Sequence, residues 1–141
     1  MFRRNTEFFL FDIFVPIQKI KKVVQNFKTP EELLYSFTDW DSVIREFEIM
    51  GEATKFLIKD ELLPQEFQII VDFRNQISHK YFGIEPEIVW NIAQHDLPRF
   101  ENLVIEEIHN IEPSLKEELI NSFVQDNIYL NFVVHSLKGL Q

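Results

Sequence analysis

The sequence lacks cysteine altogether and contains only three glycines among its 141 residues. The first absence excludes disulfide bonds, thiolate zinc sites and a cysteine nucleophile, and it suits a reducing compartment. With so few glycines there is no glycine-rich phosphate loop, and no serine sits in a nucleophile elbow. No stretch approaches the roughly 18 consecutive apolar residues that a membrane span needs. We therefore expect a soluble, cytoplasmic protein with no membrane contact.

Positive charge is also scarce, since 14 Lys and Arg stand against 23 Asp and Glu and give a net charge of -9. Such a balance argues against broad affinity for nucleic acid. Residues 1–30 are the exception, with six Lys or Arg against two acids. Their arginines precede an apolar run and imitate a signal peptide, but Glu7 and Asp12 interrupt that run, so we expect no export. A local basic face and an ordinary solvated helix face both remain open.

The apolar residues recur at intervals of three and four, and no segment alternates as a strand does, so the pattern predicts an all-α fold. The length suits a single domain over residues 1–141. In the first helix, over about 9–27, Phe8, Phe11 and Phe14 widen the apolar face beyond what one partner helix would cover. This width predicts a second contact surface, for which a dimer interface is one candidate.

Start and stop signals divide the chain into further helices. Thr29 as N-cap, with Pro30 and Glu32 after it, predicts a short helix to about residue 37. Asp39 is then expected to cap the next helix. In that helix Gly51 permits the close approach of a neighbouring backbone.

The second half of the chain carries similar signals. The chain restarts near Pro64, and the next helix is expected to stop at Gly83. Pro86 opens a helical stretch that Pro98 divides into two pieces. A capping box of Ser114 and Glu117 then predicts one helix over about 114–138.

One stretch, "VDFRNQISHKYFGI" (residues 71–84), combines a helical apolar pattern with several polar side chains. On a helix, Arg74, Ser78 and Tyr81 follow the spacing i, i+4, i+7, and Asn75 and His79 follow i, i+4 on the adjoining stripe. These side chains are therefore expected to gather on one side of the helix. They form either a functional site or a polar patch on a structural helix.

The structural alternative gives each of these residues an ordinary role. Arg74 would pair with an acid such as Asp72 or Glu85, and His79 would be an interior histidine with its hydrogen bonds satisfied. Tyr81 would be a core residue with its hydroxyl at the rim. Periodicity alone does not exclude this interpretation.

The functional interpretation follows from the kinds of catalysis that the sequence does not exclude. The four histidines show no spacing that would place two on one helical face, so we predict no metal site. A histidine and an arginine without a metal suit the cleavage of RNA. His79 would act as general base on the ribose 2′-hydroxyl or as general acid on the leaving 5′-oxygen. Arg74 would stabilise the charge on the phosphorane-like transition state.

Three segments, in order along the chain, resemble a known family. "RNQISHKY" (residues 74–81) resembles the signature of HEPN domains, in which Arg is followed after four residues by His and, after one further residue, by Tyr. "EIMGEATKFL" (residues 48–57) and "YFGIEPEIVWNIAQHDLPRF" (residues 81–100) resemble the HepT-like toxin branch of that family. The similarity covers about residues 5–111, and the predicted helix at 114–138 lies beyond it.

The resemblance implies an all-α, HEPN-like antiparallel bundle of about five main helices, with a C-terminal helical extension, that forms a homodimer. It also implies a metal-independent endoribonuclease toxin that cleaves RNA. Carried over to this sequence, Arg74 and His79 would be catalytic, and Asn75 and Ser78 would support them. A structured RNA such as tRNA would be held by a local basic patch, for which we name Arg3, Arg4, Lys80 and Arg99.

The resemblance further implies a partner and a means of control. Such toxins are typically paired with an MntA-like nucleotidyltransferase antitoxin, which transfers AMP from ATP to the motif tyrosine, here Tyr81. Bulky, negatively charged AMP beside Arg74 and His79 would fill the site and repel RNA. The partner would hold ATP and magnesium, so we expect no cofactor in this chain.

Two other functions remain open on the sequence. The chain could be a non-catalytic module that binds substrate or nucleotide for a partner nucleotidyltransferase, or a purely structural dimerising bundle. A nucleotidyltransferase in the neighbouring reading frame would favour the toxin or the binding module over the structural bundle. RNA cleavage by the purified chain would then separate the toxin from the binding module.

Overall fold

The computed structural model describes residues 2–79 and 83–141, with side chains from Thr6 onward. All regular secondary structure in these ranges is helical, and no strand occurs in them. The all-α prediction is therefore confirmed. No helix in the described ranges has the length and apolar character to cross a membrane.

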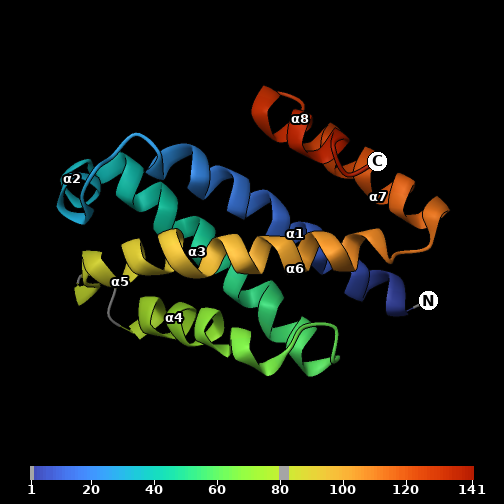
Figure 1. Ribbon diagram of the computed structural model, residues 1–141, viewed down its shortest axis with the longest axis horizontal. Coiled ribbons are helices and arrows are strands. Elements are labelled where there is room, and N and C mark those ends of the chain that lie inside the picture. The colour runs from blue at the N-terminus through green and yellow to red at the C-terminus, as the bar shows by residue number, and fades with distance from the viewer. Residues whose placement is uncertain (1, 80–82) are drawn as a thin grey trace.

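The bundle is built on two long helices that pack along each other, α1 (Phe2–Val24) and α3 (Phe37–Lys59). Helix α4 (Gln68–His79) packs against α3, and α6 (Leu97–His109) packs against α1 (Figure 1). The short helices α2 (Pro30–Tyr35) and α5 (Pro86–Asn91) contact each other at one end of the molecule. Large buried side chains fill the core, among them Phe11 of α1, Phe47 of α3, Phe100 of α6 and Phe67 of the 3₁₀ turn η1 (Gln65–Phe67).

The start of α2 confirms the predicted cap. The hydroxyl of Thr29 accepts a hydrogen bond from the backbone N–H of Glu32 at 3.2 Å. The carboxylate of Glu32 in turn accepts one from the backbone N–H of Lys28 at 2.8 Å. These bonds satisfy backbone donors that would otherwise lack partners at the helix start.

The predicted cap of α3 is wrong by three residues. Helix α3 begins at Phe37 with Ser36 at the N-cap, so Asp39 lies in its first turn. The Ser36 hydroxyl donates a hydrogen bond of 2.6 Å to the Asp39 carboxylate. Asp39 retains a favourable place, because a negative charge in the first turn complements the helix dipole.

The stretch from residue 86 to 109 divides as predicted. Pro86 is the first residue of α5, and Pro98 lies in the first turn of α6. Between these helices is a π-helical turn, Ile92–Asp96, labelled η3. Pro98 lacks an N–H and cannot bond back to the preceding turn, which explains why the regular α-helical pattern is interrupted there.

The C-terminal extension differs from its prediction. The single helix expected over 114–138 is two helices, α7 (Pro113–Asp126) and α8 (Asn131–Lys138). The buried side-chain amide of Asn127 donates to the carbonyl of Phe123 at 2.9 Å, a local bond that competes with continued helix. The predicted capping box is also wrong, because Glu112 caps α7 by accepting from the N–H groups of Ser114 and Leu115.

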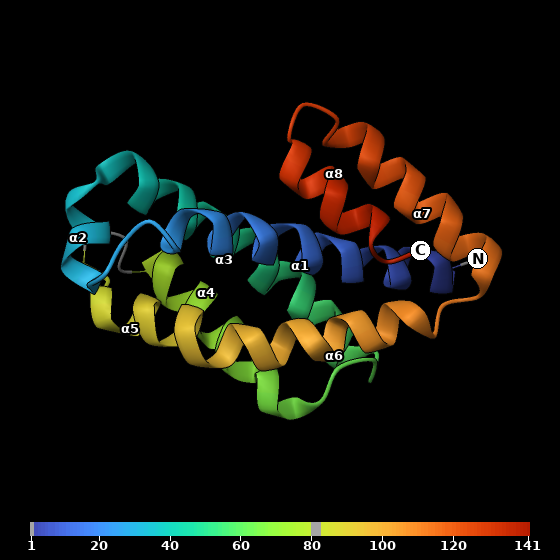
Figure 2. The same ribbon diagram turned by 45° about the horizontal axis from the view of Figure 1, so that its top comes forward.

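This helix pair covers the wide apolar face of α1. Figures 1 and 2 both show α7 and α8 on the side of α1 that faces away from α4. The ring of Phe123 lies 4.8 Å from that of Phe8 and 5.2 Å from that of Phe11. The second contact surface predicted on α1 therefore exists, but the chain's own C-terminal helices cover it, in place of the dimer partner that we considered.

Candidate active site

Helix α4 is positioned by its apolar side. Ile70, Val71, Phe73 and Ile77 are buried, and the centroid of the Phe73 ring lies 5.1 Å from that of Phe47 on α3, with the two rings nearly perpendicular. Its polar side chains are therefore held at the surface of the bundle. The helical register predicted for residues 71–79 is confirmed.

Gly51 on α3 lies directly against the stem of Arg74. A methyl group placed on Gly51 would lie 2.4 Å from Cβ and 2.8 Å from Cγ of Arg74, and 3.3 Å from the carbonyl oxygen of Ile70. The first two distances are far below van der Waals contact, and the third is a tight contact. The sequence-based expectation that Gly51 permits a close approach is confirmed, and the residue that approaches is Arg74.

The guanidinium of Arg74 is held from two sides. Its Nη2 lies 3.0 Å from Oε2 of Glu52 on α3, and its Nη1 donates to Oδ1 of Asn75 at 3.3 Å. Neither of the acids considered from the sequence, Asp72 and Glu85, takes this place. Asp72 instead accepts a hydrogen bond from Gln68. Sequence reasoning missed Glu52 as the partner, although it quoted the segment that contains it.

Arg74 lines a surface hollow of about 390 Å³ between α1, α3 and α4, here named the Arg74 hollow. Charged groups of both signs line it, two arginines and three carboxylates. Its lining consists of Phe9, Asp12, Arg45, Glu48, Ile49, Glu52, Ala53 and Arg74.

His79 lines a different hollow of about 250 Å³, here named the His79 hollow, together with Asp72, Asn75 and Gln76. His79 is exposed, so it is not the interior histidine of the structural alternative. Positions 74 and 79 are separated by about 140° around a helix, which explains why they line separate hollows. Asn75 connects the two hollows, because it accepts a hydrogen bond from Arg74 and also lines the His79 hollow.

The remaining predicted site residues that the structure describes, Ser78 and Arg99, line neither the Arg74 hollow nor the His79 hollow. The Ser78 hydroxyl donates to the carbonyl of Arg74 at 3.3 Å and so supports the helix itself. Arg99 contacts Glu66 and Asp96, and its guanidinium lies over the ring of Phe67 at 5.5 Å. Tyr81 and Lys80, and the side chains of Arg3 and Arg4, lie outside the described residues.

Asp12 gives the Arg74 hollow an unusual carboxyl group. Burial raises its pKa from 3.8 to about 6, because the charged form loses contact with water. No side chain or N–H group in the described part of the chain donates a hydrogen bond to it. The carboxylate is therefore costly to hold in its charged form, although Arg45 and Arg74 line the same hollow.

The raised pKa of Asp12 predicts how stability depends on pH. Protonated Asp12 is tolerated in its buried place, and below pH 3.8 it is protonated in both the folded and the unfolded protein. This contribution to the free energy of unfolding is lost as the pH rises through about 6, because the folded protein must then hold Asp12 as a charged carboxylate. At pH 8 the free energy of unfolding of Asp12→Asn should therefore be about 1 kcal/mol higher than that of the parent, because asparagine carries no charge to bury. This figure allows for solvent screening of a partly buried group. The difference should shrink toward pH 4. Urea unfolding at both pH values measures it, and an equal difference at both would contradict the assignment.

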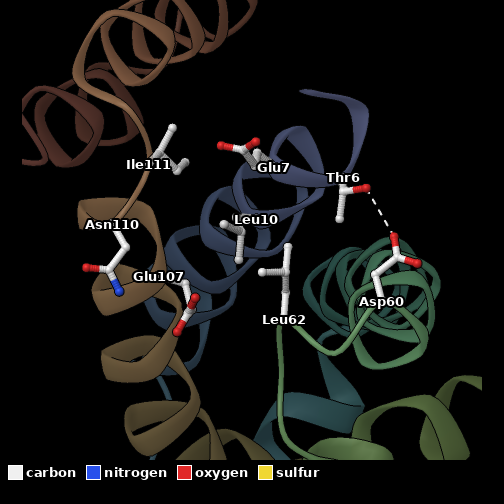
Figure 3. A pocket seen from close by; sticks show the side chains of 8 residues that line it. All are labelled: Thr6, Glu7, Leu10, Asp60, Leu62, Glu107, Asn110 and Ile111. Carbon is white, nitrogen blue, oxygen red and sulfur yellow. Dashed lines mark hydrogen bonds between the residues drawn. The ribbon is translucent and has the colours of Figure 1, made fainter. Parts of the chain in front are cut away.

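A third hollow, of about 520 Å³, lies elsewhere, between the start of α1, the end of α3 and the end of α6 (Figure 3). Three carboxylates line it, those of Glu7, Asp60 and Glu107, and Thr6 donates to Asp60 at 3.0 Å. None of the predicted site residues lines it. Its negative charge makes it unsuitable for a phosphate backbone.

The comparisons identify the class of protein that this fold and this motif helix define. Residues 15–107, more than half of the chain, match the family model described as Ribonuclease HepT-like. The chain belongs to this HepT-like branch of the HEPN ribonucleases. Helices α7 and α8 lie outside the matched residues.

Relatives among known proteins agree with the family. The chain is 32% identical over 115 residues to a protein of Methanocaldococcus jannaschii named "Putative RNase", covering 78% of this chain and 93% of the relative. A second protein of that name and organism is 30% identical over 107 residues, covering 74% and 97%. "Probable ribonuclease HepT" of Thermococcus cleftensis is 29% identical over 108 residues, covering 72% and 97%. No solved structure matches the chain.

Proposed function

We propose that the chain is a metal-independent endoribonuclease that acts as the toxin of a toxin–antitoxin pair in the cytoplasm. The observation that carries the proposal is the arrangement on α4 in a chain of the HepT-like family. There an exposed histidine lies beside a hollow, and an arginine is anchored by an acid from the neighbouring helix. Two names among its relatives, an RNase and a ribonuclease HepT, support the same activity.

The chemistry uses the 2′-hydroxyl of the RNA itself. As that oxygen attacks the neighbouring phosphorus, its proton passes to a base, and the 5′-oxygen leaves with a proton from an acid. His79 supplies one of these proton transfers. Arg74 binds the phosphate and stabilises its growing negative charge. The products are a 2′,3′-cyclic phosphate and a 5′-hydroxyl.

A homodimer completes this site in the proposal. Arg74 and His79 line separate hollows within one chain, and one histidine does not easily serve both sides of the phosphorus. The apolar face of α1 is already covered by α7 and α8, so the dimer must use another surface. The exposed side of α4 suits this role, because Ile69 is 43% exposed there and lies on the same helix as exposed His79.

The proposed substrate is a structured RNA such as tRNA. A net charge of -9 disfavours general RNA binding, so contact with phosphates must be local. Arg3, Arg4, Lys80 and Arg99 are the proposed patch. In the described structure Arg99 already contacts two acids, so it would have to exchange them for phosphate.

The experiment that tests this function is RNA cleavage by the purified chain in a buffer that contains a metal chelator, beside variants of Arg74 and His79. We expect fragments that end in 2′,3′-cyclic phosphate and 5′-hydroxyl groups. RNA that stays intact, or cleavage that needs a metal ion, would overturn the proposal. RNA that stays intact while the chain binds a nucleotidyltransferase would favour the non-catalytic binding module.

The proposed control of the toxin is the transfer of AMP to Tyr81 by a nucleotidyltransferase antitoxin that uses ATP and magnesium. Co-expression with a nucleotidyltransferase encoded beside this chain should raise its intact mass by whole AMP units and abolish cleavage. Tyr81→Phe should prevent the increase. The other two tyrosines, Tyr35 and Tyr129, are exposed and serve as matched Tyr→Phe controls. An unchanged mass, or AMP retained by Tyr81→Phe, would contradict the assignment.

A further inference from the structure

The ion pair between Glu52 and Arg74 joins α3 to the motif helix α4. The distance from Nη2 of Arg74 to Oε2 of Glu52 is 3.0 Å. This carboxylate oxygen is shielded from solvent, and it accepts no hydrogen bond from the residues that the structure describes. The contact between Glu52 and Arg74 is therefore electrostatic, and water does not reach the Oε2 atom that makes it.

Stability alone does not explain this pair well. The side chain of Glu52 is 42% exposed and that of Arg74 is 33% exposed. Ion pairs with this much exposure contribute about 0–1 kcal/mol to the free energy of unfolding. A contact that stabilises the fold so little can nevertheless decide where a long, flexible side chain lies.

Arginine needs such a restraint if it is to bind a transition state. Its side chain loses about 2 kcal/mol of rotamer entropy when it is fixed. Catalysis requires its guanidinium within about 0.5 Å of the productive position. Here Gly51 fixes the stem, Asn75 holds Nη1 and Glu52 holds Nη2. A guanidinium has five N–H donors, so these contacts leave others for a phosphate.

We propose that Glu52 is a positioning residue of the ribonuclease site, which acts through Arg74 and does not touch the RNA. The inference rests on the proposed function. It assigns a role to a residue on α3, outside the Arg–His motif. Glu52 supplies the charge that orients Arg74, and Gly51 beside it supplies the space.

The test is a double-mutant cycle that compares Glu52→Gln, Arg74→Ala and the double variant under single-turnover conditions. Glu52→Gln keeps the shape but removes the charge, so kcat should fall by about 10- to 100-fold, as expected for a misplaced catalytic group. KM should change much less. The double variant should be no slower than Arg74→Ala, because Glu52 acts only through that arginine.

The matched control is Glu101→Gln, which breaks another ion pair between helices, 3.0 Å from Lys21 on α1, remote from α4. It should cleave RNA at the parent rate. Glu52→Asp, which keeps the charge on a shorter stem, should lose less activity than Glu52→Gln, and it replaces that variant if the glutamine form does not fold.

The outcomes separate the two proposals. If Arg74→Ala and His79→Ala cleave at the parent rate, the proposed function itself fails. If those two variants lose activity but Glu52→Gln does not, only the positioning role fails. A double variant much slower than Arg74→Ala would also overturn it, because Glu52 would then act independently of Arg74.

Discussion

Replacing His79 by alanine should slow RNA cleavage by about 100-fold or more, the usual contribution of a general acid or base. His79 is exposed at the last described turn of α4 and makes no hydrogen bond that the described structure records. The free energy of unfolding should therefore change by less than about 0.5 kcal/mol. Rates of cleavage of a defined RNA, with urea unfolding of the same samples, measure both quantities.

The matched control is His135→Ala, which makes the same change at an exposed histidine on α8, remote from α4. It should retain the parent rate. Asn75→Ala should lose less activity than His79→Ala, because Asn75 orients Arg74 and transfers no proton. If His79→Ala cleaved RNA as fast as the parent, the assignment of His79 as the catalytic acid or base would be wrong.

Local sequence signals were sufficient wherever a helix is bounded by its own residues. Thr29 with Pro30 predicted the start of α2, and Pro86 predicted the start of α5, because caps and proline act on the nearest turn. The cap of α7 was missed because the helix starts earlier than predicted, at Pro113, where Glu112 accepts from the N–H groups of Ser114 and Leu115. Glutamate is not among the preferred capping residues, so the sequence favoured Ser114.

Contacts between distant segments were harder to predict. Helical spacing placed Arg74 and His79 in register, but it overestimated how far they converge, since they line separate hollows. Glu52 precedes Arg74 by 22 positions, and only the packing of α3 on α4 brings them together. The apolar pattern on α1 predicted that a second segment packs on this helix, but it did not identify the segment. A wide apolar face indicates that the face is buried and does not indicate which part of the chain covers it.

Gly51 is the position where a small substitution should have the largest structural effect. Within a helix, replacing glycine by alanine ordinarily stabilises a protein by about 0.5–1 kcal/mol, because alanine loses less backbone entropy. Here the new methyl group would lie 2.4 Å from Cβ of Arg74, so α3 and α4 must separate. Overpacking of this kind costs about 1–3 kcal/mol. Gly51→Ala should therefore lower the free energy of unfolding and slow cleavage by about 10-fold or more, because Arg74 moves relative to Glu52.

The matched control for this change is Gly139→Ala at the end of α8, where φ is -66° and the nearest atom to an added methyl group lies 3.3 Å away. It should be close to neutral for both stability and cleavage. Truncating Arg74 to alanine does not relieve the Gly51→Ala clash, because the clashing Cβ remains. Gly51→Ala should thus destabilise the Arg74→Ala background as well, whereas Glu52→Gln should not. Equal unfolding free energies for Gly51→Ala and the parent would show that α3 and α4 do not pack as closely as the structure indicates.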